Sequence, residues 1–102
     1  MDEIKDLFEL VDDELQDAMK YAKKAMDKKA TCLADAELYY SLSLEEIKHK
    51  QSLHNRAVNK MHDFIEKHPE KEDIVKEVFD ALNERTIDWE NSIRVYQAMY
   101  RE

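Results

Sequence analysis

Apolar residues recur every three or four positions along most of the chain, which is the spacing of an α-helix. The pattern breaks around residues 27–31 and again at His68-Pro69. It therefore predicts three helices, over about residues 3–28, 32–67 and 70–100. The middle segment carries two apolar stripes, so we expect it to pack against both of the others. The predicted fold is all-α, a single domain over residues 1–102 that forms an antiparallel bundle of three long helices.

The third segment, over about residues 70–100, has one apolar face that should point into the bundle. We expect its core face to consist of Ile74, Val75, Val78, Phe79, Leu82, Trp89, Ile93, Tyr96 and Tyr100. The antiparallel register of the second and third helices places His54 level with Glu84, so these two side chains could form a structural hydrogen bond.

Composition narrows the class of function. The 102 residues include 24 acidic and 16 basic side chains, no glycine and one cysteine. Without glycine, neither a Gly-rich nucleotide-binding turn nor a tight β-hairpin is expected, and one cysteine cannot form an internal disulfide. The net charge of −8 disfavours nucleic acid and anionic membranes as partners and is compatible with cations. With no long apolar run, we expect a cytoplasmic protein, or one inside a bacterial or phage compartment.

Three ionisable residues interrupt the apolar stripes. Glu14 stands between Leu7 and Tyr21 on the first helix, and Glu46 and His49 stand on the inward row of the second. If the first turn is centred near residue 30, residues whose numbers add up to about 60 are level, and Glu14 and Glu46 meet this condition. His49 lies one turn beyond Glu46 on the same face. The three side chains are therefore predicted to converge at one point between two helices.

Two carboxylates and an imidazole suit a first-row divalent metal, with iron expected and manganese or zinc as alternatives. Di-iron carboxylate sites in four-helix bundles use a Glu from each of two helices and a Glu-x-x-His from each of the other two. One chain supplies half of that set: Glu14, Glu46 and His49. We therefore expect a homodimer or higher homo-oligomer to complete the site. The alternative is a structural, hydrogen-bonded polar cluster in a non-catalytic interaction or oligomerisation module, phage-associated or regulatory.

The stretch from Ala36 to His49, with its Glu-Glu-x-x-His ending, resembles the second metal-binding helix of the ferritin-like superfamily, above all the encapsulated-ferritin and rubrerythrin types. Residues 13–18 resemble the first ligand helix, and the whole chain resembles small bacterial and prophage ferritin-like proteins. The resemblance spans about residues 8–65 and leaves the third helix unexplained. It implies a ferritin-like helical hairpin, iron ligands at the three positions named above, completion of the site by subunit pairing, and oxidation of ferrous iron. A self-contained ferritin is not expected, because the chain has one Glu-x-x-His motif.

Three further residues are candidates for the surroundings of the metal. Tyr21 and Tyr39 lie two turns from Glu14 and Glu46 on the same faces, so either could bond a ligand or simply fill the core. Asp88 on the third helix could orient the free ring nitrogen of His49, or could take part in a surface salt bridge.

Overall fold

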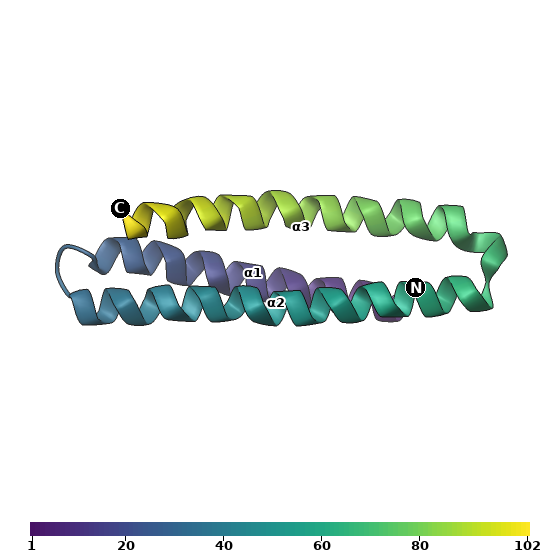
Figure 1. The fold of residues 1–102 in the computed structure, drawn as a ribbon, viewed down its shortest axis with the longest axis horizontal. Coiled ribbons are helices and arrows are strands. Elements are labelled where there is room, and N and C mark those ends of the chain that lie inside the picture. The colour runs from purple at the N-terminus through teal and green to yellow at the C-terminus, as the bar shows by residue number, and fades with distance from the viewer.

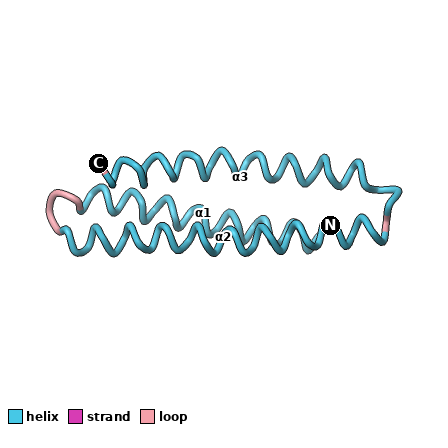
Figure 2. The backbone as a smooth tube through the Cα atoms, viewed as in Figure 1, coloured by secondary structure: helices cyan, strands magenta, loops and turns pink.

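The computed structural model describes residues 1–102, and the chain is helical from Asp2 to Arg101 apart from two short connections (Figure 2). Its elements, in chain order, are α1 (Asp2–Lys28), α2 (Leu33–Lys67), the 3-10 turn η1 (Pro69–Lys71) and α3 (Glu72–Arg101). Successive helices run in opposite directions, side by side, along a rod 57 Å long and 17 × 16 Å across (Figure 1). The prediction of an all-α chain is confirmed.

The helix α1 owes its buried face to a regular spacing of apolar residues. Buried positions alternate at intervals of four and three, which keeps them on one side of the helix. They are Ile4, Phe8, Val11, Leu15, Ala18, Ala22 and Ala25. The last three are alanines, which allow α2 to approach closely in this half of the molecule. The hydroxyl of Ser43 on α2 donates a 2.7 Å hydrogen bond to the backbone carbonyl of Ala18, a contact that so short a side chain makes only between close helices.

The core consists of three apolar clusters along the rod, and every cluster draws on all three helices. The first, near η1, contains Ile4, Phe8, Ala57, Met61, Val75 and Phe79. The central cluster contains Val11, Leu15, Ala18, Ile47 and Ile93, and the third contains Ala25, Ala36 and Tyr100. In the first cluster the rings of Phe8 and Phe79 pack edge to face, with their centroids 5.2 Å apart. Burial of these side chains is what attaches α3 to the α1–α2 hairpin.

The prediction for α3 is wrong at Ile74, which is 63% exposed. Its neighbour Val75 is buried instead. Successive helical residues point about 100° apart, so of two adjacent apolar residues only one can lie at the centre of the buried face. Phe79 and Ile93 fix that face in line with Val75. Ile74 therefore faces the solvent at the edge of α3.

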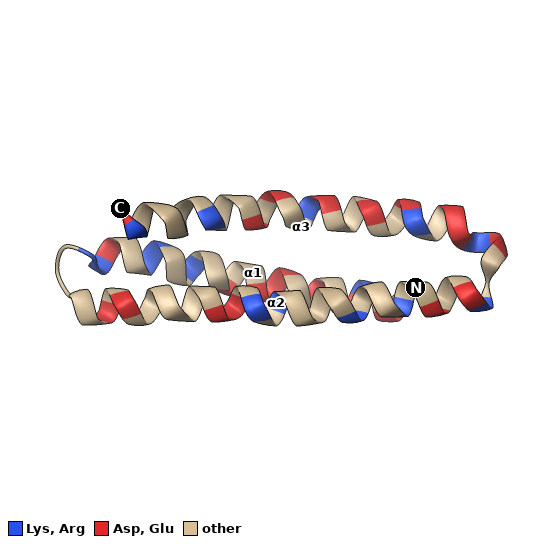
Figure 3. Cartoon of the chain, viewed as in Figure 1, with Lys and Arg blue, Asp and Glu red and all other residues tan.

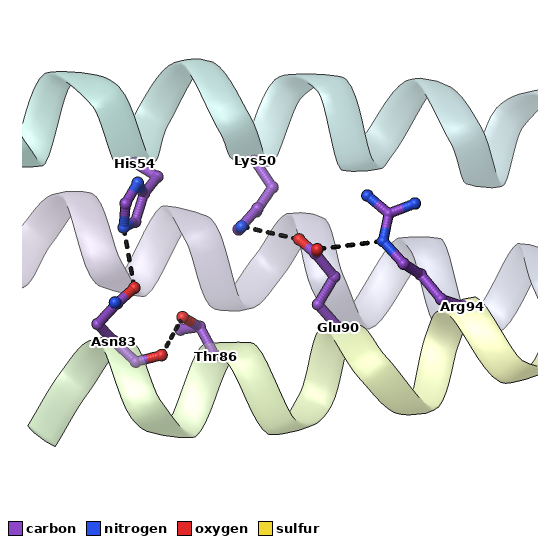
Figure 4. A network of polar contacts seen from close by, with 6 residues as sticks. All are labelled: Lys50, His54, Asn83, Thr86, Glu90 and Arg94. Atoms are coloured by element: carbon purple, nitrogen blue, oxygen red, sulfur yellow. Dashed lines mark hydrogen bonds and ion pairs between the residues drawn. The ribbon is translucent and has the colours of Figure 1, made fainter. Parts of the chain in front are cut away.

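The seam between α2 and α3 is bridged by polar side chains (Figure 4). The ammonium of Lys50 lies 2.7 Å from Oε1 of Glu90, whose other oxygen accepts a 3.2 Å bond from Arg94. His54 donates to Oδ1 of Asn83 at 2.8 Å. The expected contact of His54 with Glu84 is therefore wrong. The predicted register of the two helices was correct to within one residue. A shift of one position along a helix changes the direction of the side chain by about 100°, and Glu84 is therefore exposed.

Charged side chains occur along all three helices (Figure 3). No helix has the long, charge-poor apolar stretch that crossing a lipid bilayer requires.

Candidate metal centre

Glu14 of α1 meets Glu46 and His49 of α2 where these two helices pack, with His49 toward the solvent; we call the surface formed by these three residues the outer groove. Nδ1 of His49 lies 3.4 Å from Oε2 of Glu14 and 3.7 Å from Oε2 of Glu46. One ligand atom from each residue can be chosen so that no two are more than 4.8 Å apart. The convergence expected from the sequence is therefore present, and it arises because the tight turn after Lys28 sets the two helices in register.

The three side chains differ in their exposure to solvent. The side chains of Glu14 and Glu46 are 26% and 17% exposed, whereas that of His49 is 56% exposed. Oε2 of Glu14 has no accessible surface and no hydrogen-bond partner. Nδ1 of His49 lies within ion-pair distance of this atom but forms no hydrogen bond with it, and a buried carboxylate oxygen without a hydrogen bond costs free energy.

The arrangement fits a first-row metal ion. Ligand atoms about 2.1 Å from such an ion lie roughly 3.0 to 4.2 Å from one another. The separations of His49 from the two carboxylates, 3.4 and 3.7 Å, fall within this range. The widest separation, at most 4.8 Å, requires a side-chain movement of under about 1 Å. One chain offers three possible ligands, and the exposed side of His49 leaves room for further ligands from solvent or from another molecule.

The two tyrosines near the centre pair with each other. The rings of Tyr21 and Tyr39 stack, with centroids 6.2 Å apart and planes inclined by 17°. Lys20 and Lys24 lie over these rings, 5.0 and 5.4 Å from the respective centroids. Neither hydroxyl forms a hydrogen bond to a candidate ligand. The pair therefore joins α1 to α2 two turns from the centre and does not support its candidate ligands directly.

Asp88 does not reach His49. It is exposed, and its backbone carbonyl accepts a bond from Ser92 one turn later in α3. The reason is the side from which α3 approaches: its polar contacts reach α2 at Lys50 and His54, whereas His49 points into the outer groove. No protein group bonds the second ring nitrogen of His49.

Sequence reasoning missed the buried polar residues beside the centre. Lys50 is buried, and Ser43 is fully enclosed. Both belong to a row on α2 whose spacing alternates between four and three, as in α1: Ser43, Ile47, Lys50, His54, Ala57 and Met61. A lysine on that row is the signal that could have revealed the ion pair with Glu90, since a buried charge requires a partner.

A scan of protein-family models, a search of the curated proteins and a search of the solved structures each gave no match. The resemblance to ferritin-like ligand helices therefore stays a prediction from the sequence, based on the motif from Glu45 to His49.

Proposed function

We propose that the protein binds a first-row divalent metal through Glu14, Glu46 and His49, with iron as the expected ion. The observation that carries this proposal is the buried Oε2 of Glu14, which forms no hydrogen bond and lies 3.4 Å from Nδ1 of His49. A cation at this point would satisfy that oxygen and the carboxylate of Glu46 together. Carboxylate and imidazole ligands suit iron, manganese and zinc.

The site is half of a dinuclear centre in this proposal, and a second copy of the chain supplies the other half. Two copies bring four carboxylates and two imidazoles, the ligand set of ferritin-like di-iron proteins. The exposed imidazole of His49 and the exposed Leu10, one turn before Glu14, support a partner on this groove. The close α1–α2 pair then acts as a ferritin-like hairpin.

In such a centre the carboxylates of Glu14 and Glu46 and the imidazole of His49 would hold the metals. Iron, when bound, would supply electron transfer to oxygen or peroxide, with carboxylate ligands favouring the ferric state. The chain's own residues bind the ion, and the solvent-facing side of His49 gives access to it.

Metal titration tests the proposal. Purified, metal-free protein is titrated with Fe²⁺ under anaerobic conditions, and with Co²⁺ as a spectroscopic substitute. We expect binding by the natural chain, a loss of at least about 10-fold in affinity in Glu46→Gln, and natural affinity in Glu45→Gln. Glu45 is the matched control, because it is the adjacent residue of α2, carries the same charge and is exposed. Absence of bound iron, manganese and zinc after reconstitution would reject the proposal.

The alternative is a metal-free interaction module, and one observation favours it. Nδ1 of His49 lies within ion-pair distance of both carboxylates, so the three side chains could form a polar cluster without a metal. Thermal unfolding distinguishes the two readings, because an ion bound only by the folded chain stabilises it by about 2.7 kcal/mol at 100 times its dissociation constant. If the protein binds metal, we expect added metal to raise the melting temperature of the natural chain and of His62→Gln, an exposed control on α2. The melting temperature of His49→Gln should not change.

A further inference from the structure

Lys50 is the one charged residue among the buried side chains of the protein. It follows His49 directly and points to the other side of α2, into the seam with α3. Its ammonium lies 2.7 Å from Glu90, and both side chains are largely shielded from water, with exposures of 9% and 18%. Arg94, whose side chain is 51% exposed, bonds the second oxygen of Glu90 (Figure 4).

This ion pair is the middle one of three polar contacts that join α2 to α3. On one side of it, the amide of Gln97 donates a 2.9 Å bond to Ser43, which in turn donates to the backbone of α1. On the other side, His54 bonds Asn83. The contacts at Ser43 and Lys50 enclose the stretch of α2 that carries Glu46 and His49.

Polar contacts of this kind constrain the rotation of a helix about its own axis. Rotating α2 by about 10° would move an atom roughly 5 to 6 Å from the axis by about 1 Å. An apolar contact resists such a rotation less sharply, since the hydrophobic effect is non-directional. A buried hydrogen bond or ion pair resists it more strongly, because it weakens steeply with distance and angle and leaves a desolvated group behind.

We infer that α3 is a positioning element for the candidate metal centre: through the Lys50–Glu90 ion pair it fixes the rotation of α2 at which Glu46 and His49 face Glu14. Glu90 is thus a positioning residue that touches none of the three ligands. The consequence for metal affinity rests on the proposed function, whereas the consequence for side-chain alignment concerns the metal-free protein.

The test replaces the ion pair by apolar residues of similar size, in the double variant Lys50→Met/Glu90→Leu. Such replacements of a buried ion pair commonly leave a protein as stable as before or more stable. We expect a melting temperature equal to or above that of the natural chain, together with a loss of about 10-fold in Co²⁺ affinity and an altered Co²⁺ absorption spectrum. In metal-free protein, the nuclear Overhauser contacts between the His49 ring and the Glu14 side chain should weaken.

The matched control is Lys76→Met/Glu72→Leu, the same two substitutions at an exposed ion pair within α3. It should change neither the Overhauser contacts nor the affinity. If the buried double variant proves unstable, Glu90→Gln is measured instead, since the amide keeps the shape and one acceptor; it should shift affinity and contacts in the same direction by a smaller factor. Natural contacts and natural affinity in the folded variant would overturn the inference. Failure of the natural chain to bind metal would overturn the proposed function instead, and the Overhauser contacts would then decide the inference alone.

Discussion

Oε2 of Glu14 on α1 faces Nδ1 of His49 on α2 at 3.4 Å, and yet it forms no hydrogen bond. Burying a carboxylate oxygen without a hydrogen bond lowers the stability of the folded state, and the total stability of a small protein is only about 5–15 kcal/mol. The same position on the preceding and the following heptads holds Leu7 and Tyr21, so an apolar residue would fit there. We therefore expect Glu14 to serve a function, such as metal binding, that outweighs the free energy lost by burying its carboxylate.

Glu14→Leu should stabilise the metal-free protein by about 1 kcal/mol, because it removes a desolvated carboxylate and extends the apolar row from Leu7. The same variant should lose all stabilisation by added metal. Urea unfolding with and without Co²⁺ measures both effects. Asp13→Leu, at the exposed neighbouring position, serves as the control and should leave both the metal-free stability and the metal effect unchanged. A destabilised Glu14→Leu would mean that the carboxylate contributes to folding by itself.

Leu10→Lys should prevent self-association through the outer groove. Leu10 is 48% exposed and lies one turn before Glu14, so a lysine there would be placed in the proposed contact between two copies. Sedimentation velocity of the metal-loaded protein should show dimers or larger species for the natural chain and monomers for the variant. Ile87→Lys, which adds the same charge at a residue of α3 with 47% exposure, should behave as the natural chain does. Monomeric natural protein in the presence of metal would contradict the prediction.

Ser43→Ala should destabilise the fold by about 2 kcal/mol. The hydroxyl of Ser43 is fully buried, donates to the carbonyl of Ala18 and accepts from Gln97, so its removal leaves the buried amide of Gln97 without this partner and the Ala18 carbonyl with its helix bond alone. Chemical denaturation measures the change. Ser52→Ala provides the comparison, since Ser52 is exposed and bonds only within its own helix; its loss should cost less than about 0.5 kcal/mol.

The ion pair of Lys50 with Glu90 should give the protein a stability that depends on acid pH. Burial by itself would raise the pKa of Glu90, but the bonds from Lys50 and Arg94 outweigh burial and lower it below the ordinary value of 4.5. A carboxyl group with a lowered pKa in the folded state contributes stability that is complete above its unfolded pKa and is lost as the pH falls through the folded pKa.

At pH 7 the natural chain should therefore exceed Glu90→Gln by about 2 kcal/mol in free energy of unfolding. This difference should shrink as the pH falls from 4.5 downwards. Urea titrations at several pH values measure it. Glu72→Gln, which disrupts the exposed pair with Lys76, should show little difference at any pH. A constant difference between pH 7 and about pH 3 would show that the charge of Glu90 is not what stabilises the seam.

The sequence by itself determined the helices and the meeting of the three candidate ligands. Helix formation depends on local spacing, and α1 repeats its four-three pattern from Ile4 to Ala25 without interruption. The meeting of Glu14 with Glu46 followed from the same regularity, because a short turn between two straight helices fixes which residues are level.

Only the tertiary structure decided how α3 joins the hairpin. Lys50 finds Glu90, His54 bonds Asn83 instead of Glu84, and Asp88 stays in solvent, all of which depend on the rotation of α3 and on the side from which it approaches. That rotation is set by the joint packing of Phe8 with Phe79 and of Leu15 with Ile93, and by buried polar bonds from distant parts of the chain. Periodicity gives each helix a face, but the angle at which two faces meet is a property of the side chains packed between them.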